Sequence, residues 1–225
     1  MYNMALWVFG CSFSVSAGQV PKNTHPTWVE LLANKMGLEE YHNYAEWGVS
    51  NEFIVDQFMK VNDQIQSKDT VIIQVTEKSR QWFFEDQPEI GNFYITDLHK
   101  HVTKDQKRAV DLYITHLDRD NLQDIRYALT CMALSHVAEI RQDCRIMILP
   151  GFNYVPGVKG SLLEVCNNEF ISDETRHAWY TKYPIDLRTN HLSKNNHVIL
   201  AEKIFHAFGT GTLLDLTVGF ESKFL

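Results

Sequence analysis

The sequence lacks three features: a Cys-x-x-Cys pair, a long hydrophobic run, and a cluster of basic residues. Without a Cys-x-x-Cys pair, a zinc ribbon or a dithiol redox site is disfavoured. The even cysteine count would allow two disulfides. We instead expect free thiols, because Cys131 and Cys144 fall in stretches that are predicted to be a buried helix and a buried strand.

The charge balance and the first residues exclude further classes of protein. The formal net charge is −7, and phosphate contacts need clustered Lys and Arg, so we expect no nucleic-acid partner. The first residues lack the basic segment of a signal peptide, and no apolar stretch approaches the roughly 20 residues that span a bilayer. We therefore expect a cytoplasmic protein with no membrane partner. The sequence leaves the oligomeric state open.

What the chain does contain is typical of a globular protein. Hydrophobic residues make up 44% and charged residues 22%, which argues against disorder. A length of 225 residues, with no repeat or linker, favours one domain over residues 1–225. Predicted strands alternate with predicted helices, which favours an α/β fold: a three-layer α/β/α sandwich with a parallel sheet. The strands are expected at 5–10, 39–44, 71–75 and 145–149, and the helices after Pro26 and Ser50 and at 103–117, 121–142 and 194–208.

Two helices have patterns that suggest which residues share a face. In the helix at 121–142, apolar residues recur at helical spacing. In the last helix, capped by Ser193 and ended by Gly209 and Gly211, one apolar face is expected to point inward. The residues concerned are Leu122, Ile125, Leu129, Met132, Ala133, Val137 and Ile140 in the first, and Val198, Ile199, Ala201, Ile204 and Phe205 in the second.

Residues suited to catalysis follow the predicted strands. In a parallel sheet, ligands bind beyond the carboxyl ends of the strands. Ser12 follows the first strand in a Gly-Cys-Ser turn, where a hydroxyl would be exposed near backbone N–H donors, as a nucleophile requires. Taken alone, the position of Ser12 favours a turn or cap residue over a nucleophile. His191 precedes the capped last helix and could take the Ser12 proton. A zinc site is disfavoured, because His191 and His197 are six residues apart and no third ligand has suitable spacing.

Three blocks together resemble the SGNH (GDSL-like) hydrolases, in the divergent form often seen in phage genomes. The blocks are WVFGCSFSVSAG, NYAEWGVSNEFI and NHLSKNNHVILAEKI, and they span most of the chain. The resemblance implies a flavodoxin-like SGNH hydrolase fold. It also implies Ser12 as nucleophile, His191 as base, Gly48 as a backbone donor to the oxyanion with Asn51 close by, and His197 in a non-catalytic position.

The chain departs from the family pattern at two places. The family usually has an Asp three residues before the catalytic His, where this chain has Arg188; the nearest acid is Asp186, so the site would be either a triad with Asp186 or a Ser–His dyad. The family's third block supplies an Asn to the oxyanion hole. Here the corresponding segment, QVTEKSR, has no Asn, and Thr76, Ser79 or Arg80 would have to supply the donor.

The resemblance implies a serine esterase or deacetylase that needs no cofactor and hydrolyses a small acyl ester, with O-acetyl groups on carbohydrate as the commonest family substrate. One alternative is a related fold that binds a glycan or a protein without hydrolysis. Another is an acyltransferase with a sugar acceptor, in which the aromatic residues 82–84 exclude water. Cys11 as the nucleophile is a further alternative. Because neighbours on a tight turn point in different directions, we expect either Cys11 or Ser12 to face the core.

Overall fold

A parallel four-stranded sheet forms the centre of the computed structural model, which describes residues 4–19, 25–38, 40–82, 103–166 and 191–221. The strand order is β2-β1-β3-β4, and every pairing is parallel. This is the flavodoxin-like order of doubly wound α/β folds, so the predicted fold class is confirmed. The strands are β1 (Leu6–Phe9), β2 (Tyr41–Asn43), β3 (Thr70–Val75) and β4 (Arg145–Pro150).

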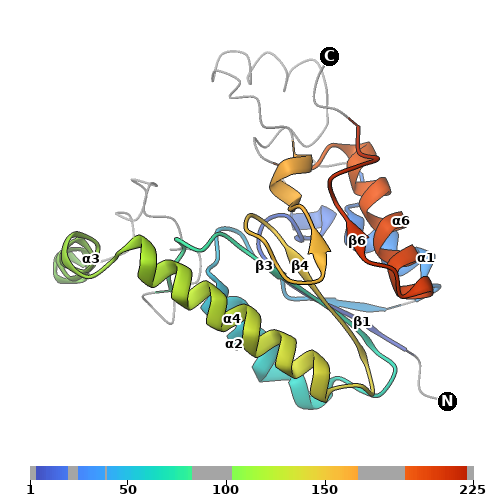
Figure 1. Cartoon of the computed structure of the whole chain (residues 1–225), viewed down its shortest axis with the longest axis horizontal. Coiled ribbons are helices and arrows are strands. Elements are labelled where there is room, and N and C mark those ends of the chain that lie inside the picture. The colour runs from blue at the N-terminus through green and yellow to red at the C-terminus, as the bar shows by residue number, and fades with distance from the viewer. Residues whose placement is uncertain (1–3, 20–24, 39, 83–102, 167–190, 222–225) are drawn as a thin grey trace.

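Helices cover both faces of this sheet and give the fold three layers (Figure 1). On one face α1 packs against α6, and α2 and α4 cover the other face. Helix α3 precedes α4 and extends beyond the sheet, and of its residues only Val110 is buried. The helices are α1 (Trp28–Lys35), α2 (Asn51–Val61), α3 (Lys104–His116), α4 (Asp120–Ile140) and α6 (Lys194–Thr210), with short 3-10 turns η1 (Ala17–Gln19), η2 (Asn62–Gln64) and η4 (Leu162–Val165).

The tail after α6 contains a short strand. Strand β6 (Leu214–Asp215) pairs in parallel with β5 (Val158–Lys159) in a separate two-stranded sheet. The buried Asn196 side chain of α6 holds the rest of the tail. It donates to the Val165 and Glu221 carbonyls at 3.0 and 3.3 Å and accepts from the Glu221 N–H at 2.9 Å.

The two inner strands are completely buried, which explains their sequence. All four residues of β1 and all six of β3 are inaccessible, because helices lie on both faces of the sheet. Strands buried on both faces appear as continuous apolar runs rather than alternating ones. The two polar residues within β3, Thr70 and Gln74, are therefore exceptions that need local partners.

The predicted helix starts are confirmed by their caps. The Ser50 hydroxyl accepts from the Phe53 N–H at 3.3 Å, and the Ser193 hydroxyl accepts from the Asn196 N–H at 3.1 Å. At the far end of α6, Gly211 is the left-handed residue that ends the helix, with φ of 68°. The prediction that Gly209 also ends it is wrong, because Gly209 lies inside the last turn.

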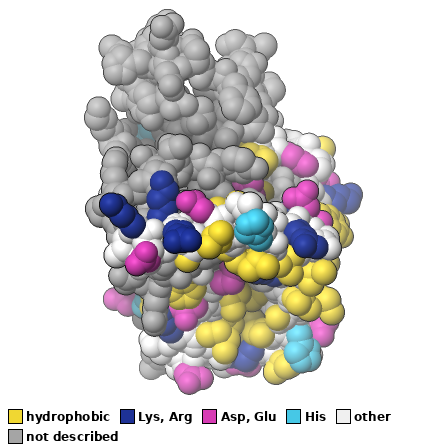
Figure 2. Space-filling view, turned by 90° about the vertical axis from the view of Figure 1, so that its left-hand side faces the viewer, with side chains coloured by type: hydrophobic (Ala, Val, Ile, Leu, Met, Phe, Trp, Pro, Cys, Tyr) yellow, Lys and Arg dark blue, Asp and Glu magenta, His cyan; other side chains and the backbone are white. Residues whose placement is uncertain are grey.

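Apolar residues of α4 and α6 are exposed, which for α6 differs from the prediction that they face inward. The apolar residues of α4 at 125, 129, 132 and 140 point outward, and Figure 2 shows exposed apolar side chains on this side of the molecule. The buried positions of α4 are Gln123, Cys131 and Leu134. In α6, Val198 and Phe205 are exposed, contrary to the expectation that they face inward. A helix that is apolar on nearly all sides does not reveal its inner face by periodicity alone.

Two further expectations concern the whole described part of the chain. All four cysteines are buried free thiols, as predicted. Within the described residues, no helix combines the length and the apolar character that a membrane crossing requires.

Candidate active site

The candidate site lies where β1 and β3 leave the sheet at their carboxyl ends. The register pairs Phe9 with Ile73 and Val75 with Pro150, so the segments after β1, β3 and β4 leave the same edge. Past β2, the Glu46 N–H donates to the Gly10 carbonyl at 3.1 Å. This contact places the segment NYAEWGVSNEFI, which contains Glu46, at the same edge of the sheet. The order of the sheet reverses between β1 and β3, and ligands of doubly wound proteins bind at this position.

Ser12 lies in a tight turn directly after β1. The turn is closed by the Ser14 N–H, which donates to the Cys11 carbonyl at 2.9 Å. The Cys11 side chain is fully buried in the core. One of the two neighbours was expected to face the core, and Cys11 does so. Ser12 is buried, with 8% of its surface exposed to solvent.

A buried glutamine from β3 holds this turn in place. The Gln74 amide oxygen accepts from the Cys11 N–H at 2.9 Å and from the Ser14 hydroxyl at 3.1 Å, while its nitrogen donates to the Val75 carbonyl at 2.8 Å. Glycines make room for this amide on both sides. A Cβ at Gly10 would lie 2.7 Å from its oxygen, and a Cβ at Gly151 would lie 2.3 Å from its nitrogen. Only glycine permits so close an approach at either position.

Contacts from two more elements fix the backbone that follows Ser12. The Trp28 indole of α1 donates to the Phe13 carbonyl at 2.9 Å. The Asn43 amide of β2 donates to the Ser14 carbonyl at 2.8 Å. Together with Gln74, these contacts tie the turn to β3, α1 and β2. Sequence reasoning missed all three residues, although a single polar residue inside the apolar run VIIQV was a signal for Gln74.

The structure brings His191 to the residue next to Ser12. The imidazole lies against the Phe13 ring with 5.1 Å between ring centroids, and Phe13 also packs on Phe152 at 5.0 Å. His191 stands just before α6, whose Ser193 cap fixes the start of the helix. The predicted acid Asp186, like Arg188, lies outside the described residues.

His197, the second histidine of the last block, has a structural contact. Its side chain is buried, and Nδ1 accepts from the Trp28 N–H at 3.1 Å. The bond joins α6 to the first turn of α1, so this histidine positions helices. Across the described ranges, no group of three or more His, Cys, Asp or Glu side chains could hold a metal ion.

Asn51 joins the segment after β2 to the segment QVTEKSR, which contains the end of β3 and the turn after it. Its amide oxygen accepts from the Thr76 N–H at 2.8 Å, and its amide nitrogen donates to the Thr76 carbonyl at 3.3 Å. Thr76 can therefore offer a ligand only its hydroxyl, and Asn51 has one remaining N–H. Gly48, the predicted backbone donor, lies in the preceding turn with φ of 66°, a left-handed conformation that favours glycine.

Arg80, another predicted donor, is also buried in the segment after β3. Its side chain is 8% exposed, and its Cζ lies 5.1 Å from the centre of the Phe152 ring. Its Nε is 3.8 Å from the Glu77 carboxylate, which makes an ion pair longer than a hydrogen bond. Thr76, Arg80 and, through Phe13 and Phe152, His191 therefore lie along one edge of the sheet.

The strand order and the helices on both faces define a doubly wound α/β protein. Polar side chains gather at the carboxyl edge of its sheet, where the strand order reverses between β1 and β3. Among solved structures, the chain is similar to the crystal structure of a lipase/acylhydrolase from Enterococcus faecalis. The two are 15% identical with a TM-score of 0.31, and the match covers 95% of this chain and 75% of that one. No protein-family model and no curated protein matches the chain.

Proposed function

We propose that this chain is a serine esterase or deacetylase of the SGNH type, with Ser12 as nucleophile and His191 as base. The observation that carries the proposal is the contact between His191 and Phe13, the neighbour of Ser12, at the carboxyl edge of the sheet. Two segments about 180 residues apart in the chain meet there, and the rest of the turn is held rigidly by Gln74, Trp28 and Asn43.

The reaction follows from these groups. The Ser12 hydroxyl attacks the ester carbonyl carbon while the His191 imidazole takes its proton. The tetrahedral intermediate collapses, the carbon–oxygen bond to the alcohol breaks, and imidazolium returns the proton to the leaving oxygen. Water, deprotonated by His191, then attacks the acyl-enzyme and releases the acid and free Ser12.

The developing oxyanion needs donors aimed at it. In the proposed site these are the backbone N–H groups of Ser12 and Gly48 and one side-chain donor, from Asn51, Thr76, Ser79 or Arg80. Asp186 would orient His191 in a triad, and without it the pair would work as a dyad. The substrate would be a small acyl ester, such as an O-acetyl group on a carbohydrate.

Labelling with a fluorophosphonate probe tests the nucleophile. We expect the wild-type chain to be labelled, Ser12→Ala to lose all labelling, and His191→Ala to react at least about 100-fold more slowly, as expected when a general base is lost. Ser16→Ala is the matched control, because this serine lies in the same segment and its hydroxyl is bound by the Asn43 amide of β2, away from the proposed reaction. Labelling that persists in Ser12→Ala would refute the proposal.

Product analysis tests the reaction type. With an O-acetylated oligosaccharide, we expect free acetate to appear in step with loss of the ester and to be absent with Ser12→Ala. Acetate transfer to an added sugar, in place of acetate release, would identify an acyltransferase on the same residues. A chain that is neither labelled nor active would be a binding protein.

A further inference from the structure

The turn after β3, residues 76–80, contains an unusual concentration of buried polar atoms without a hydrogen-bond partner. These atoms are the Thr76 hydroxyl, the Ser79 hydroxyl and the Nε and Nη1 of Arg80, none of which has a partner within the described residues. Buried polar groups are nearly always paired, because removing them from water without a partner is costly, most of all for a charge. Three neighbouring side chains with this property indicate that a group outside the described residues completes them.

The surroundings of Arg80 do not satisfy its guanidinium. The Phe152 ring face attracts the positive charge. A ring face nevertheless leaves the N–H donors without acceptors. Among the described residues, Glu77 forms an ion pair with Arg80: the carboxylate lies 3.8 Å from Nε, and the backbone carbonyl of Glu77 accepts from the backbone N–H of Arg80 at 3.2 Å. The buried charge is therefore partly balanced, while Nε and Nη1 donate no hydrogen bond within the described residues.

Two other cationic side chains of this chain have hydrogen-bond partners, unlike Nε and Nη1 of Arg80 within the described residues. Arg141, at the opposite end of the sheet, donates to the Asp143 carboxylate, to the Asn62 side chain and to the Ile65 carbonyl at 2.9 Å each. Lys78, within the same turn as Arg80, pairs with Asp124 at 2.5 Å on the surface. The unused donors of Arg80 are thus a property of its position rather than of the chain's cations in general.

The position of Arg80 connects it with the proposed site. Arg80 lies over Phe152, Phe152 packs on Phe13 at 5.0 Å, and Phe13 contacts His191 at 5.1 Å. Three contacts, through the rings of Phe152 and Phe13, therefore connect the guanidinium with the proposed base. A substrate whose ester reaches Ser12 could place another group at the 76–80 turn.

We propose that the 76–80 turn binds an acidic group of the substrate, a carboxylate or a phosphate, with Arg80 as its charge partner and Thr76 and Ser79 as hydroxyl donors. This inference rests on the proposed function and narrows it to esters that also carry a negatively charged group. Arginine suits this role because its planar fork donates two parallel hydrogen bonds to a carboxylate or phosphate. An oxyanion of a tetrahedral intermediate needs only one such donor, whereas an acid group with several oxygens would use all three side chains.

The kinetic test compares two substrates with the same acyl length, mono-4-nitrophenyl glutarate and the neutral 4-nitrophenyl pentanoate. We expect the wild-type chain to prefer the anionic ester by about tenfold or more in kcat/KM, an amount typical of one charge-assisted contact. Arg80→Met should abolish this preference, mainly through KM for the anionic ester. Arg80→Lys should keep part of it, because the charge remains and the fork is lost. Lys78→Met, in the same turn, is the matched control and should keep the full preference.

A binding test separates this inference from the proposed function. The inactive Ser12→Ala chain is heated with sodium glutarate, with sodium phosphate or with sodium chloride at equal ionic strength. We expect glutarate or phosphate to raise Tm, and the rise to be lost when Arg80→Met or Arg80→Gln is added. The anion that acts identifies the acid group. A chain that hydrolyses no ester but shows this Arg80-dependent rise would retain the anion site and refute only the hydrolase. Equal kcat/KM for both esters, with no Tm rise from either anion, would overturn the inference.

Discussion

At the scale of single residues, Gln74 has the most consequences for the site. It is a polar side chain inside a fully buried strand, and such a residue is stable only when its amide is hydrogen-bonded. Its amide is bonded at both ends, and its oxygen serves the turn that holds Ser12. A residue of the core therefore determines the position of the proposed nucleophile without touching a substrate.

Replacing Gln74 by Met should lower both stability and activity. The Cys11 N–H and the Ser14 hydroxyl would lose their acceptor while buried, and each unsatisfied group costs about 1–3 kcal/mol. We expect the free energy of unfolding to fall by roughly 2–4 kcal/mol in urea titrations. We also expect kcat for 4-nitrophenyl acetate to fall at least about tenfold in the folded fraction. A variant with normal kcat would show that the turn keeps its shape without this amide.

At the scale of secondary-structure elements, α4 shows why its periodicity did not predict its inner face. Residues 127–138 contain no Asp, Glu, Lys or Arg, so the sequence offers no polar side to contrast with an apolar one. Packing against the sheet selects the side with Cys131 and Leu134. The larger apolar residues Leu129 and Met132 remain 59% and 67% exposed.

Substitutions on the exposed side and on the buried side of α4 should differ clearly in their effect on the free energy of unfolding. Leu129→Gln should change the free energy of unfolding by less than about 0.5 kcal/mol, because exposed positions contribute little. Leu134→Ala, at a position only 2% exposed, should cost about 2–4 kcal/mol through the cavity that it leaves. Urea titrations at two protein concentrations measure both values. Destabilisation by Leu129→Gln as large as by Leu134→Ala would contradict the observed orientation of the helix.

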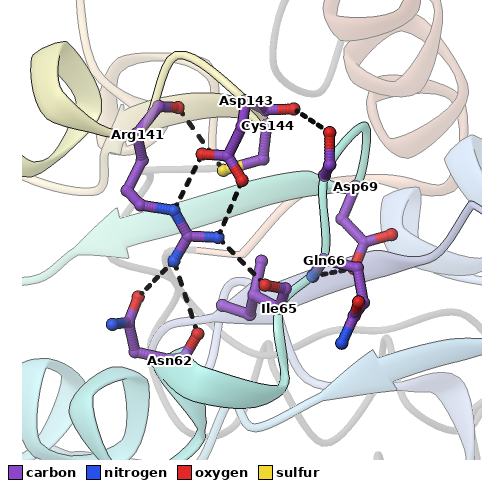
Figure 3. A network of polar contacts seen from close by, with 8 residues as sticks. Asn62, Ile65, Gln66, Asp69, Arg141, Asp143 and Cys144 are labelled. Atoms are coloured by element: carbon purple, nitrogen blue, oxygen red, sulfur yellow. Dashed lines mark hydrogen bonds and ion pairs between the residues drawn. The ribbon is translucent and has the colours of Figure 1, made fainter.

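The end of α4 is joined to the end of α2 by one arginine (Figure 3). Arg141 binds Asn62 and Ile65, which follow α2, and also the Asp143 carboxylate beyond α4. The hydrogen bond from Arg141 holds the pKa of Asp143 below its ordinary value. This network lies at the amino ends of the strands, remote from Ser12, because Asp143 and Cys144 precede β4.

The lowered pKa of Asp143 makes its contribution to stability dependent on pH. The folded pKa lies below the unfolded value, so the carboxylate stabilises the fold above the unfolded pKa and loses this effect as the pH falls through the folded pKa. We expect Asp143→Asn to be less stable than wild type at pH 7, with a difference that shrinks below about pH 4. Urea titrations from pH 7 to pH 3 measure it. A difference that is constant across this range would exclude the carboxylate as its source.

At the scale of the whole molecule, the sequence predicted architecture better than chemistry. Buried strands and capped helices are local features, so β1, β3, β4 and the starts of α2 and α6 were predictable from residues such as Ser50 and Ser193. Contacts between distant segments were not. The bonds from Gln74 to Cys11 and from His197 to Trp28 depend on the strand register and on helix packing, which no local pattern encodes. For the candidate site, the three blocks named Ser12, Gly48 and His191, and the side chains that hold the Ser12 turn came only from the structure.

The sheet separates the Asp69 end from the edge that holds the proposed site, and one variant can test this separation. Asp69, just before β3, accepts from the Ala5 N–H, the Trp7 indole and the Gln66 N–H at 2.8 to 2.9 Å. Six residues of β3, about 20 Å, lie between Asp69 and the edge near Ser12. Asp69→Asn should therefore cost roughly 2–4 kcal/mol of stability while kcat per folded molecule stays within about twofold. Esterase assays well below the Tm of the variant, beside urea titrations, provide both values. A large loss of kcat would mean that the two ends are coupled.

The Gln74 amide packs closely between Gly10 and Gly151. This packing limits which residues related sequences can have at these three positions. Neither glycine can acquire a side chain while the amide remains, and the amide cannot be lost while the Cys11 N–H still needs its acceptor. The three positions should therefore vary as a set among relatives, and a sequence with alanine at position 10 or 151 should also have a shorter residue at position 74. Searches for distant relatives that weight this trio jointly would detect members that a comparison by overall identity overlooks.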